Sequence, residues 1–341
     1  MSRAARSKQK QRRLLLLVVG LLIVAVLSIP GCKNLLEQIP PAVIVPSDDP
    51  PIVLPKPEPV VQLPAPDLPG VFIASIDNKS EARPQSGLDR ADMVIEMIAE
   101  AGITRYMAFF HSKAAPLVGP IRSARYYFAS IVKAYNTPFA HVGGSTRALN
   151  LIAELRIPDL DEIHNASQAF WRDNSRKMPH NLYTSTERML AEAQRKRLTI
   201  SPLPRLPEGE MPKGSANSNV SLTYSPYYKV TWQWQDGKYL RSINGKLHTM
   251  KDGARLTTDN IVIISTPHRD VVTDVLRTDI DIIGNGPAQF LRDGQQFTGT
   301  WKKASANDHF EFMVDGQLFK FKEGVTWIQV VPSMNAVVPS S

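Results

Sequence analysis

The residues of this sequence that could act on a ligand lie between positions 83 and 181, and half of them are arginines. The set contains six arginines, two histidines, two serines, one asparagine and one glutamate. A guanidinium group pairs with a carboxylate or a phosphate through two parallel hydrogen bonds, so such a set favours an anionic ligand. The predicted ligand-binding residues are Arg83, Arg105, Arg122, Ser123, Arg125, His141, Ser145, Arg172, Arg176 and Asn181.

These residues are densest in the segment 100–125. An apolar run at 103–110 predicts a buried strand, with Glu100 and Arg105 at its N-terminal edge. Those two residues could bind the ligand, or form a structural ion pair with each other. The Gly-Pro turn at 119–125 carries two arginines and a serine, and a helix is expected to begin at its Arg-Ser pair. Because helix N-termini favour anions, this helix and its arginines would attract the same ligand.

A second turn offers similar chemistry. A short apolar strand beginning at Phe139 runs into Gly143-Gly144-Ser145, and Ser145 is placed to cap a helix that reaches about Leu155. The backbone N–H groups of such a turn can bind an oxyanion or a phosphate. His141 lies inside the apolar strand, where it is either a ligand-binding residue or a hydrogen-bonded core histidine.

Catalysis would need an acid or a base, and Glu100 and His180 are the candidates for that role. Ser123 or Ser145 would be the nucleophile, but neither lies in a G-x-S-x-G or an S-x-x-K motif. His141 and His180 are far apart in the chain, and the sequence contains no H-E-x-x-H motif. We therefore expect no metal site and no cofactor.

The charge of the chain argues against a nucleic-acid partner. The formal net charge is +8, but six of the 40 basic residues precede position 14, which leaves 34 basic against 32 acidic residues. A nucleic-acid-binding protein carries its basic excess on a folded face. The length of 341 residues predicts about two domains with appendages.

Residues 1–32 have the form of a signal or lipoprotein anchor segment. An apolar run at 14–29 follows the basic cluster, as in a secretory signal, and it is shorter than the roughly 20 residues of a membrane-spanning helix. Ile29-Pro30-Gly31-Cys32 resembles the lipobox of bacterial lipoproteins, in which the cysteine is lipid-modified. A retained signal-anchor helix is the alternative. Either arrangement places the following chain at the extracytoplasmic face of a bacterial membrane.

The composition after the anchor divides the chain further. Residues 33–69 are predicted to be a disordered linker, because the eleven prolines of 40–69 favour an extended chain without a core. Alternating strand and helix patterns at 70–200 predict a mixed α/β domain with a central sheet. A second linker is expected at 201–218. Repeated hairpin patterns at 219–335 predict a smaller, mostly-β domain, a sandwich or barrel, so the expected fold class is α+β.

Several distinctive motifs follow one another along the chain. They are Asp77-Asn78, Ala82-Arg83-Pro84-Gln85-Ser86-Gly87-Leu88, Glu100-x-Gly102-Ile103-Thr104-Arg105, Gly119-Pro120-Ile121-Arg122-Ser123-Ala124-Arg125, His141-Val142-Gly143-Gly144-Ser145, Pro179-His180-Asn181, Gly299-Thr300-Trp301-Lys302 and Thr326-Trp327-Ile328-Gln329-Val330-Val331-Pro332. With these motifs the sequence resembles the YerB-like lipoprotein family, which is bacterial and envelope-anchored and has two domains of unknown function. The resemblance implies this location, this domain plan and a shared set of polar residues, and it implies no known activity.

Three functions are compatible with the sequence. The first is a non-catalytic, membrane-anchored lipoprotein whose arginine-rich face binds an anionic envelope component, such as peptidoglycan or an anionic wall polymer, or a wall-synthesis partner. The second is a cell-wall hydrolase or transferase that uses Glu100 and His180 as acid and base. The third is a scaffold that assembles other envelope proteins through the β domain. We expect the first of these.

Overall fold

The computed structural model describes residues 67–339 except 218 and 273–275. The predicted anchor at 1–32, with Cys32, lies outside the described residues, as does all but the last part of the predicted linker at 33–69. In the part of the chain that is described, no helix combines the length and the apolarity that a membrane crossing requires.

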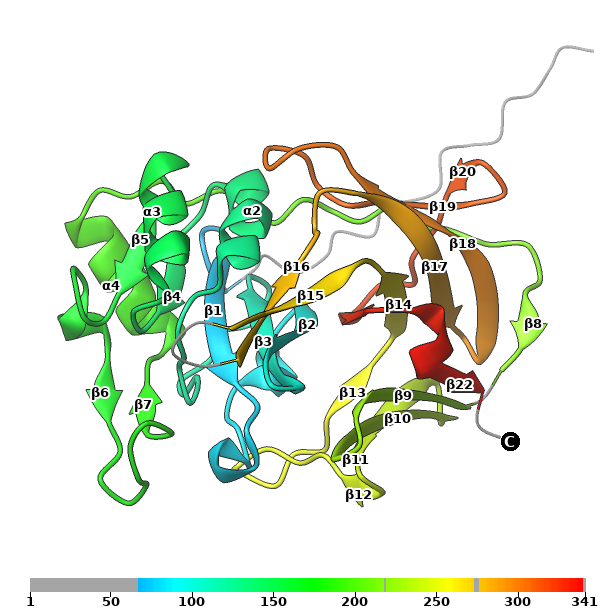
Figure 1. Ribbon diagram of the computed structural model, residues 1–341, viewed down its shortest axis with the longest axis horizontal. Coiled ribbons are helices and arrows are strands. Elements are labelled where there is room, and N and C mark those ends of the chain that lie inside the picture. The colour runs from blue at the N-terminus through cyan, green and yellow to red at the C-terminus, as the bar shows by residue number, and fades with distance from the viewer. Residues whose placement is uncertain (1–66, 218, 273–275, 340–341) are drawn as a thin grey trace, which may run out of the picture. The chain divides into compact units, whose positions relative to one another are not determined.

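Within the described ranges the chain is rich in strands and has three α-helices (Figure 1). The helices are α2 (Tyr126–Tyr135), α3 (Thr146–Glu154) and α4 (Thr186–Arg195), and the short 3-10 turns are η1 (Ser80–Ala82), η2 (Leu88–Arg90), η3 (Ser167–Ala169) and η4 (Met334–Ala336). The strands before residue 200 are β1 (Phe72–Asp77), β2 (Met93–Glu100), β3 (Ile103–Phe110), β4 (Phe139–His141), β5 (Asp159–Asp161), β6 (Trp171–Arg172) and β7 (Leu182–Tyr183). The later strands are β8 (Ser215–Ala216), β9 (Asn219–Ser225), β10 (Tyr228–Gln235), β11 (Lys238–Ile243), β12 (Lys246–Leu247), β13 (Thr257–Thr258), β14 (Asn260–Ser265), β15 (His268–Val272), β16 (Leu276–Ile280), β17 (Gly284–Arg292), β18 (Gln295–Lys303), β19 (Glu311–Val314), β20 (Gln317–Leu318), β21 (Thr326–Val331) and β22 (Val337–Pro339).

Most of these strands belong to one large sheet. Its order is β20-β19-β18-β17-β14-β21-β2-β3-β1-β4-β5, and β8, β15 and β16 attach beside this path. The sheet passes from the late to the early part of the chain where β21 pairs in parallel with β2, with Thr326 opposite Met93 and Gln329 opposite Glu96. The sequence pattern did not indicate this pairing, because parallel neighbours that are distant in sequence share no turn.

A second sheet, of order β12-β11-β10-β9-β22 with β13 beside β11, packs against one face of the large sheet. Trp232 of β10 meets Trp327 of β21 edge to face, with ring centroids 5.2 Å apart. Both indoles are buried in the core that these two sheets share with α4. The strands β6 and β7 form a separate two-stranded ribbon.

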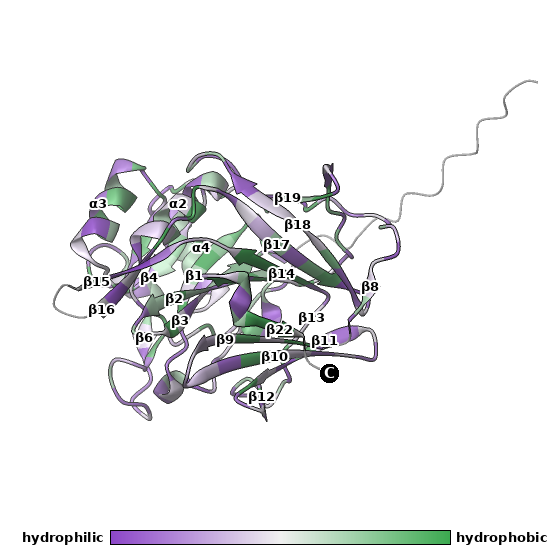
Figure 2. Cartoon of the chain, turned by 45° about the vertical axis from the view of Figure 1, so that its right-hand side comes forward, coloured by the Kyte–Doolittle hydropathy of each residue, from purple (hydrophilic) through white to green (hydrophobic). Residues whose placement is uncertain are grey.

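The large sheet has a core on each face, because side chains alternate across a strand. In β1, Phe72 and Ala74 point to the core shared with the second sheet, whereas Ile73 points to the core beneath α2 and α3. All six residues of β1 are buried. Figure 2 shows apolar residues concentrated along β14 and its neighbours at the centre of the sheet. Continuous apolar runs such as β1 and β14 are therefore strands that are covered on both faces.

A fully buried ion pair joins the two sheets. Glu96 of β2 lies 2.7 Å from Arg241 of β11, and both side chains are fully buried. The same carboxylate accepts hydrogen bonds from the hydroxyls of Tyr228, at 2.6 Å, and Thr104, at 2.7 Å. The guanidinium carbon of Arg241 also lies 4.8 Å from the centre of the Trp327 ring. A buried charge is tolerated only with such a set of partners.

The predicted strand at 103–110 is confirmed as β3, and Ser145 is confirmed as the N-cap of α3, since its hydroxyl accepts from the Ala148 N–H. The expected start of the first helix at Arg122 or Ser123 is wrong. That segment is extended because its backbone bonds to neighbouring strands and turns, with the N–H of Arg122 donating to Ser75 at 2.8 Å. The helix begins at Tyr126.

Candidate functional site

Three strands bring the first charged residues together. β1 and β3 pair antiparallel, with Asp77 opposite Arg105. β2 and β3 form a hairpin whose turn, Ala101–Gly102, has φ angles of 47° and 73°. This tight turn places Glu100 beside Arg105, because only two residues connect the two strands. The extended segment 122–125 runs beside the end of β1 and adds two more arginines.

The result is an ion-pair cluster formed by Asp77, Glu100, Arg105, Arg122, Arg125 and His180. Asp77 Oδ2 lies 2.6 Å from His180 Nδ1 and 3.1 Å from Arg122 Nε. Glu100 lies 2.5 Å from Arg125 and 3.5 Å from Arg105. Arg105 also donates to the Ser123 carbonyl at 2.8 Å, so Ser123 contributes its backbone rather than its hydroxyl to this contact.

The cluster holds its central groups in their charged forms. Burial would raise the pKa of Asp77, but the charges of Arg105 and Arg122, with hydrogen bonds from the Lys79 N–H and His180, hold that pKa below its ordinary value. Burial and the neighbouring charge of Arg125 lower the pKa of Arg105 to about 10, which leaves it cationic at neutral pH.

The two predicted catalytic residues have different partners in this cluster. Glu100 pairs with Arg105 and Arg125, whereas His180 pairs with Asp77. A general acid and a general base must reach the same substrate. Here each candidate is held in a separate ion pair, and neither is among the side chains that line the cavities described below.

A cavity of about 500 Å³ adjoins the cluster at Arg125, and we call it the arginine cavity. Arg125 is the N-cap of α2 and Ser145 is the N-cap of α3, so both helices direct their N-termini at this space. Arg147, in the first turn of α3, lines the same wall. On the opposite side β16 contributes Arg277 and Asp279. β16 is attached there by the pairing of Arg277 with Glu100 of β2.

The cavity carries more positive than negative charge. Among the described residues, Arg125, Arg147 and Arg277 line it, with Asp279 as the one acidic side chain. Arg147 lies 2.6 Å from Asp279 and stacks 3.7 Å above the ring of Tyr126, and its side chain is 64% exposed. The Nε atom of Arg125 is buried and has no hydrogen-bond partner within the described residues. The cavity can therefore take an anion, because it offers guanidinium donors and two helix N-termini together.

Other predicted ligand-binding residues lie away from this cavity. Arg172 donates to Asn181 at 3.1 Å across the β6–β7 ribbon. Arg176 donates to three carbonyl oxygens in the loop 81–84 and thereby holds the ribbon against it. Arg83 bonds to the segment after β1. These contacts tie loops to the sheet, so the structure gives these four residues local structural partners.

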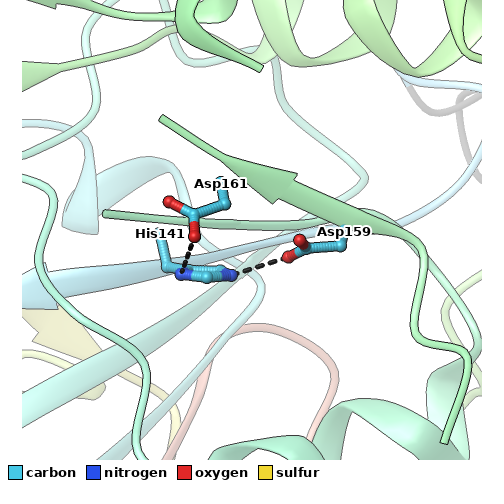
Figure 3. Close-up of side chains that lie close together, drawn as sticks. All are labelled: His141, Asp159 and Asp161. Atoms are coloured by element: carbon cyan, nitrogen blue, oxygen red, sulfur yellow. Dashed lines mark hydrogen bonds and ion pairs between the residues drawn. The ribbon is translucent and has the colours of Figure 1, made fainter. Parts of the chain in front are cut away.

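His141 lies in a different group of side chains. It ends β4, is fully buried, and faces Asp159 and Asp161 of β5 (Figure 3). Its Nε2 atom is 2.6 Å from Asp159 Oδ1. Burial would lower the pKa of His141, but the hydrogen bond to Asp159 and the two carboxylate charges raise it above its ordinary value.

Sequence reasoning missed four residues of the site: Asp77, Arg147, Arg277 and Asp279. Asp77 belongs to the Asp77-Asn78 motif, and Arg147 follows the Gly-Gly-Ser turn by two positions, so both had a local signal. Arg277 and Asp279 had none, since they reach the cavity only through the pairing of β16 with β2.

Known proteins resemble this chain over most of its length. Residues 67–199 match the N-terminal domain, and residues 219–328 the C-terminal domain, of a family described as protein of unknown function DUF3048. The Bacillus subtilis protein named "Putative lipoprotein YerB" is 32% identical over 270 residues, which cover 76% of this chain and 81% of that protein. A crystal structure of the YerB protein from Bacillus subtilis has a TM-score of 0.73 and 30% identity, and the match covers 80% of this chain and 94% of the other.

The resemblance to the YerB-like family that the motifs indicated is thereby confirmed. The two matched blocks contain the ion-pair cluster, the arginine cavity and the buried pair that joins the sheets. This chain belongs to the DUF3048 family.

Proposed function

We propose that this protein is a membrane-anchored lipoprotein of the bacterial envelope that binds an anionic ligand in the arginine cavity. The name of its Bacillus subtilis relative supports the lipoprotein assignment. In this proposal Cys32, in its lipobox-like sequence, carries the lipid, and the proline-rich segment holds the folded part away from the membrane surface.

The observation that carries the binding function is the composition of the arginine cavity. Three guanidinium groups and the N-termini of α2 and α3 converge on about 500 Å³, a volume that accommodates a small anionic group with part of its carrier. The ion pair of Arg147 with Asp279 does not prevent binding. Arg147 is exposed, and ion pairs at the protein surface contribute about 0–1 kcal/mol, so a ligand can exchange for Asp279 at little cost.

The ligand group is a carboxylate or a phosphate, since both match the fork of a guanidinium. Outside a bacterial membrane these groups are carried by the peptides of peptidoglycan and by phosphate-containing wall polymers. Binding without turnover is the expected activity, because Glu100 and His180 are each engaged in their own ion pair.

The test compares the binding of the full-length protein, kept in detergent, to soluble peptidoglycan fragments and to a poly(glycerol phosphate). The variant Arg147→Gln, Arg277→Gln removes two cavity charges. Each charge-assisted hydrogen bond contributes about 1.5–3 kcal/mol, so we expect the affinity to fall at least ten-fold. The ligand that binds identifies which of the two groups the cavity recognises.

Arg269→Gln is the matched control. Arg269 lies on the neighbouring strand β15 and pairs with the exposed carboxylate of Asp281, much as Arg147 pairs with Asp279. It does not line the cavity, so its variant should bind as the wild type does. Equal affinity of the wild type and the double variant would contradict the proposal.

A further inference from the structure

A second group of polar side chains lies beside α3, at the edge formed by β4 and β5. His141, Asp159 and Asp161 each offer one ligand atom, and these atoms all lie within 4.8 Å of one another (Figure 3). We infer that these three residues form a binding site for a divalent metal ion, and that zinc is the ion their atoms suit best. This inference does not depend on the arginine cavity.

The sheet explains why these residues meet although they are distant in the sequence. β4 and β5 pair in parallel, with His141 opposite Asp161. Because side chains two positions apart on a strand lie on the same face, Asp159 joins Asp161 on the face of β5 that His141 also occupies. In the sequence, the other candidate histidine, His180, is far from His141, and that separation argued against a metal site.

Each of the three side chains has a second partner that orients it. His141 Nδ1 lies 2.9 Å from the carbonyl of Gly143, which can only accept, so Nδ1 carries a proton. Nε2 lies 2.6 Å from Asp159 Oδ1, and it is the nitrogen at which a metal ion would replace a proton. Asp159 Oδ2 accepts from Asn165 at 2.6 Å, which leaves Oδ1 facing Nε2. A histidine whose other nitrogen donates to a carbonyl is the usual arrangement of a metal ligand.

Asp161 is oriented in the same way. Its Oδ1 atom accepts the backbone N–H groups of Gly143, at 2.7 Å, and Ile163, at 3.0 Å. Its Oδ2 atom lies 4.0 Å from His141 Nδ1 and 2.6 Å from His164 Nδ1. Because His164 is half-exposed, it could serve as a fourth ligand without disturbing the core.

A metal ion could enter this group from solvent. A cavity of about 350 Å³ is lined by Asp159, Asp161 and His164, with apolar side chains of α3 on its other wall. His141 forms the buried end of the group, and Asp159, with 22% of its side chain exposed, lies nearer the entrance. The group therefore has an entry path and room for a bound water, as a zinc centre with an open position requires.

The donor set and its charge favour zinc over magnesium. Imidazole nitrogen and carboxylate oxygen together suit zinc, whereas magnesium is held by oxygen ligands with near-octahedral geometry. The two carboxylates place two negative charges in a small, largely buried volume, and a divalent cation compensates both of them at once.

The test is calorimetric titration of the full-length protein, free of any polyhistidine tag, with zinc chloride and separately with magnesium chloride. We expect one zinc ion per chain and at least ten-fold weaker binding of magnesium. Asp159→Asn should weaken zinc binding at least ten-fold, because even the loss of a residue that merely orients a ligand costs 10–100-fold in metal affinity. Asp173→Asn is the matched control, since that carboxylate also has 22% of its side chain exposed and also pairs with one cation.

A second measurement needs no variant. His141 is fully buried, so zinc held only at the protein surface would leave the nuclear magnetic resonance signals of its imidazole unchanged, whereas zinc at this site shifts them. The inference is overturned if the wild type takes up no zinc, if these signals do not move, or if Asp159→Asn binds zinc as tightly as Asp173→Asn does.

Discussion

At the scale of single residues, the ion-pair cluster depends most on Asp77. Its carboxylate is nearly fully buried and contacts both Arg122 and His180. His180 comes from a loop 103 residues later in the chain, so this one side chain ties that loop to the end of β1. Removing the carboxylate would leave buried His180 and part-buried Arg122 without their partner, which is more costly than the loss of an exposed pair.

Asp77→Asn should destabilise the protein and also change its response to acid. The pKa of Asp77 in the folded chain lies below the ordinary value of 3.8, so its charge contributes stability above that pH, and this is lost as the pH falls through the folded pKa. Breaking a buried pair costs about 3–5 kcal/mol, so we expect a loss near 3 kcal/mol at pH 7. Below pH 4 the variant should lose less additional stability than the wild type.

Urea unfolding at several pH values between 7 and 3 measures both effects. Glu311→Gln is the control, since Glu311 forms only an exposed 4.0 Å pair with Lys302 and should follow the wild type at every pH. If the unfolding free energies of the wild type and Asp77→Asn differ by the same amount from pH 7 to pH 3, the pKa of Asp77 is not lowered by folding and the prediction is wrong.

At the scale of elements, the contact of β2 with β11 decides how the two sheets fit together. Glu96 and Arg241 are fully buried, and each has hydrogen-bond partners from its own sheet and from the other. The Nδ1 atom of His248 lies 2.7 Å from Arg241, and burial with the neighbouring arginine charge lowers the pKa of that histidine, which keeps it neutral. The joint is polar and densely hydrogen-bonded, with only the Nε atom of Arg241 lacking a partner among its guanidinium nitrogens in the described residues, and these shared bonds make it sensitive to one-sided changes.

Arg241→Met should therefore lower the free energy of unfolding more than the removal of both charges of the pair does. The single variant leaves the charge of Glu96 buried without its cation, and we expect a loss of about 3–5 kcal/mol. The double variant Glu96→Gln, Arg241→Met removes both charges and keeps a hydrogen-bonding side chain on β2. It should unfold at a higher urea concentration than Arg241→Met. Equal or lower stability of the double variant would show that the charge of Glu96 is not the source of the cost.

At the scale of the whole molecule, the two segments that match the family models share one sheet. β2 belongs to the first matched segment and the first half of β21 to the second, and the two strands pair in parallel. All residues of β2 except Glu100 are buried. If the second segment were absent, β2 would be an apolar edge strand with unpaired backbone groups, which is a template for aggregation.

Residues 63–205 expressed alone should therefore aggregate, and co-expression with residues 206–341 should recover a soluble complex. Size-exclusion chromatography with circular dichroism checks both outcomes. The control is the full chain cleaved once between 205 and 206, in a stretch without helix or strand, and it should stay assembled. A soluble, folded, monomeric first fragment would show instead that the predicted domain at 70–200 is independent of β21.

The sequence by itself determined the local elements and the family. The apolar run at 103–110 predicted β3, because a strand covered on both faces is apolar along most of its length. Ser145 predicted its helix, since capping depends only on the next few residues. The Arg-Ser turn was misjudged for a related reason, because its backbone donors are satisfied by distant partners that no local pattern reports.

The tertiary structure alone decided which of these residues act together. The pairing of β16 with β2 carries Arg277 to the arginine cavity, and the parallel pairing of β4 with β5 sets His141 beside two carboxylates. The joining of β2 to β21 merges both halves into one sheet. Hydrophobic periodicity records which face of an element is buried, but it does not record which element covers that face. The register between distant strands is fixed by the packing of the whole core, so the composition of each site became visible only in the folded chain.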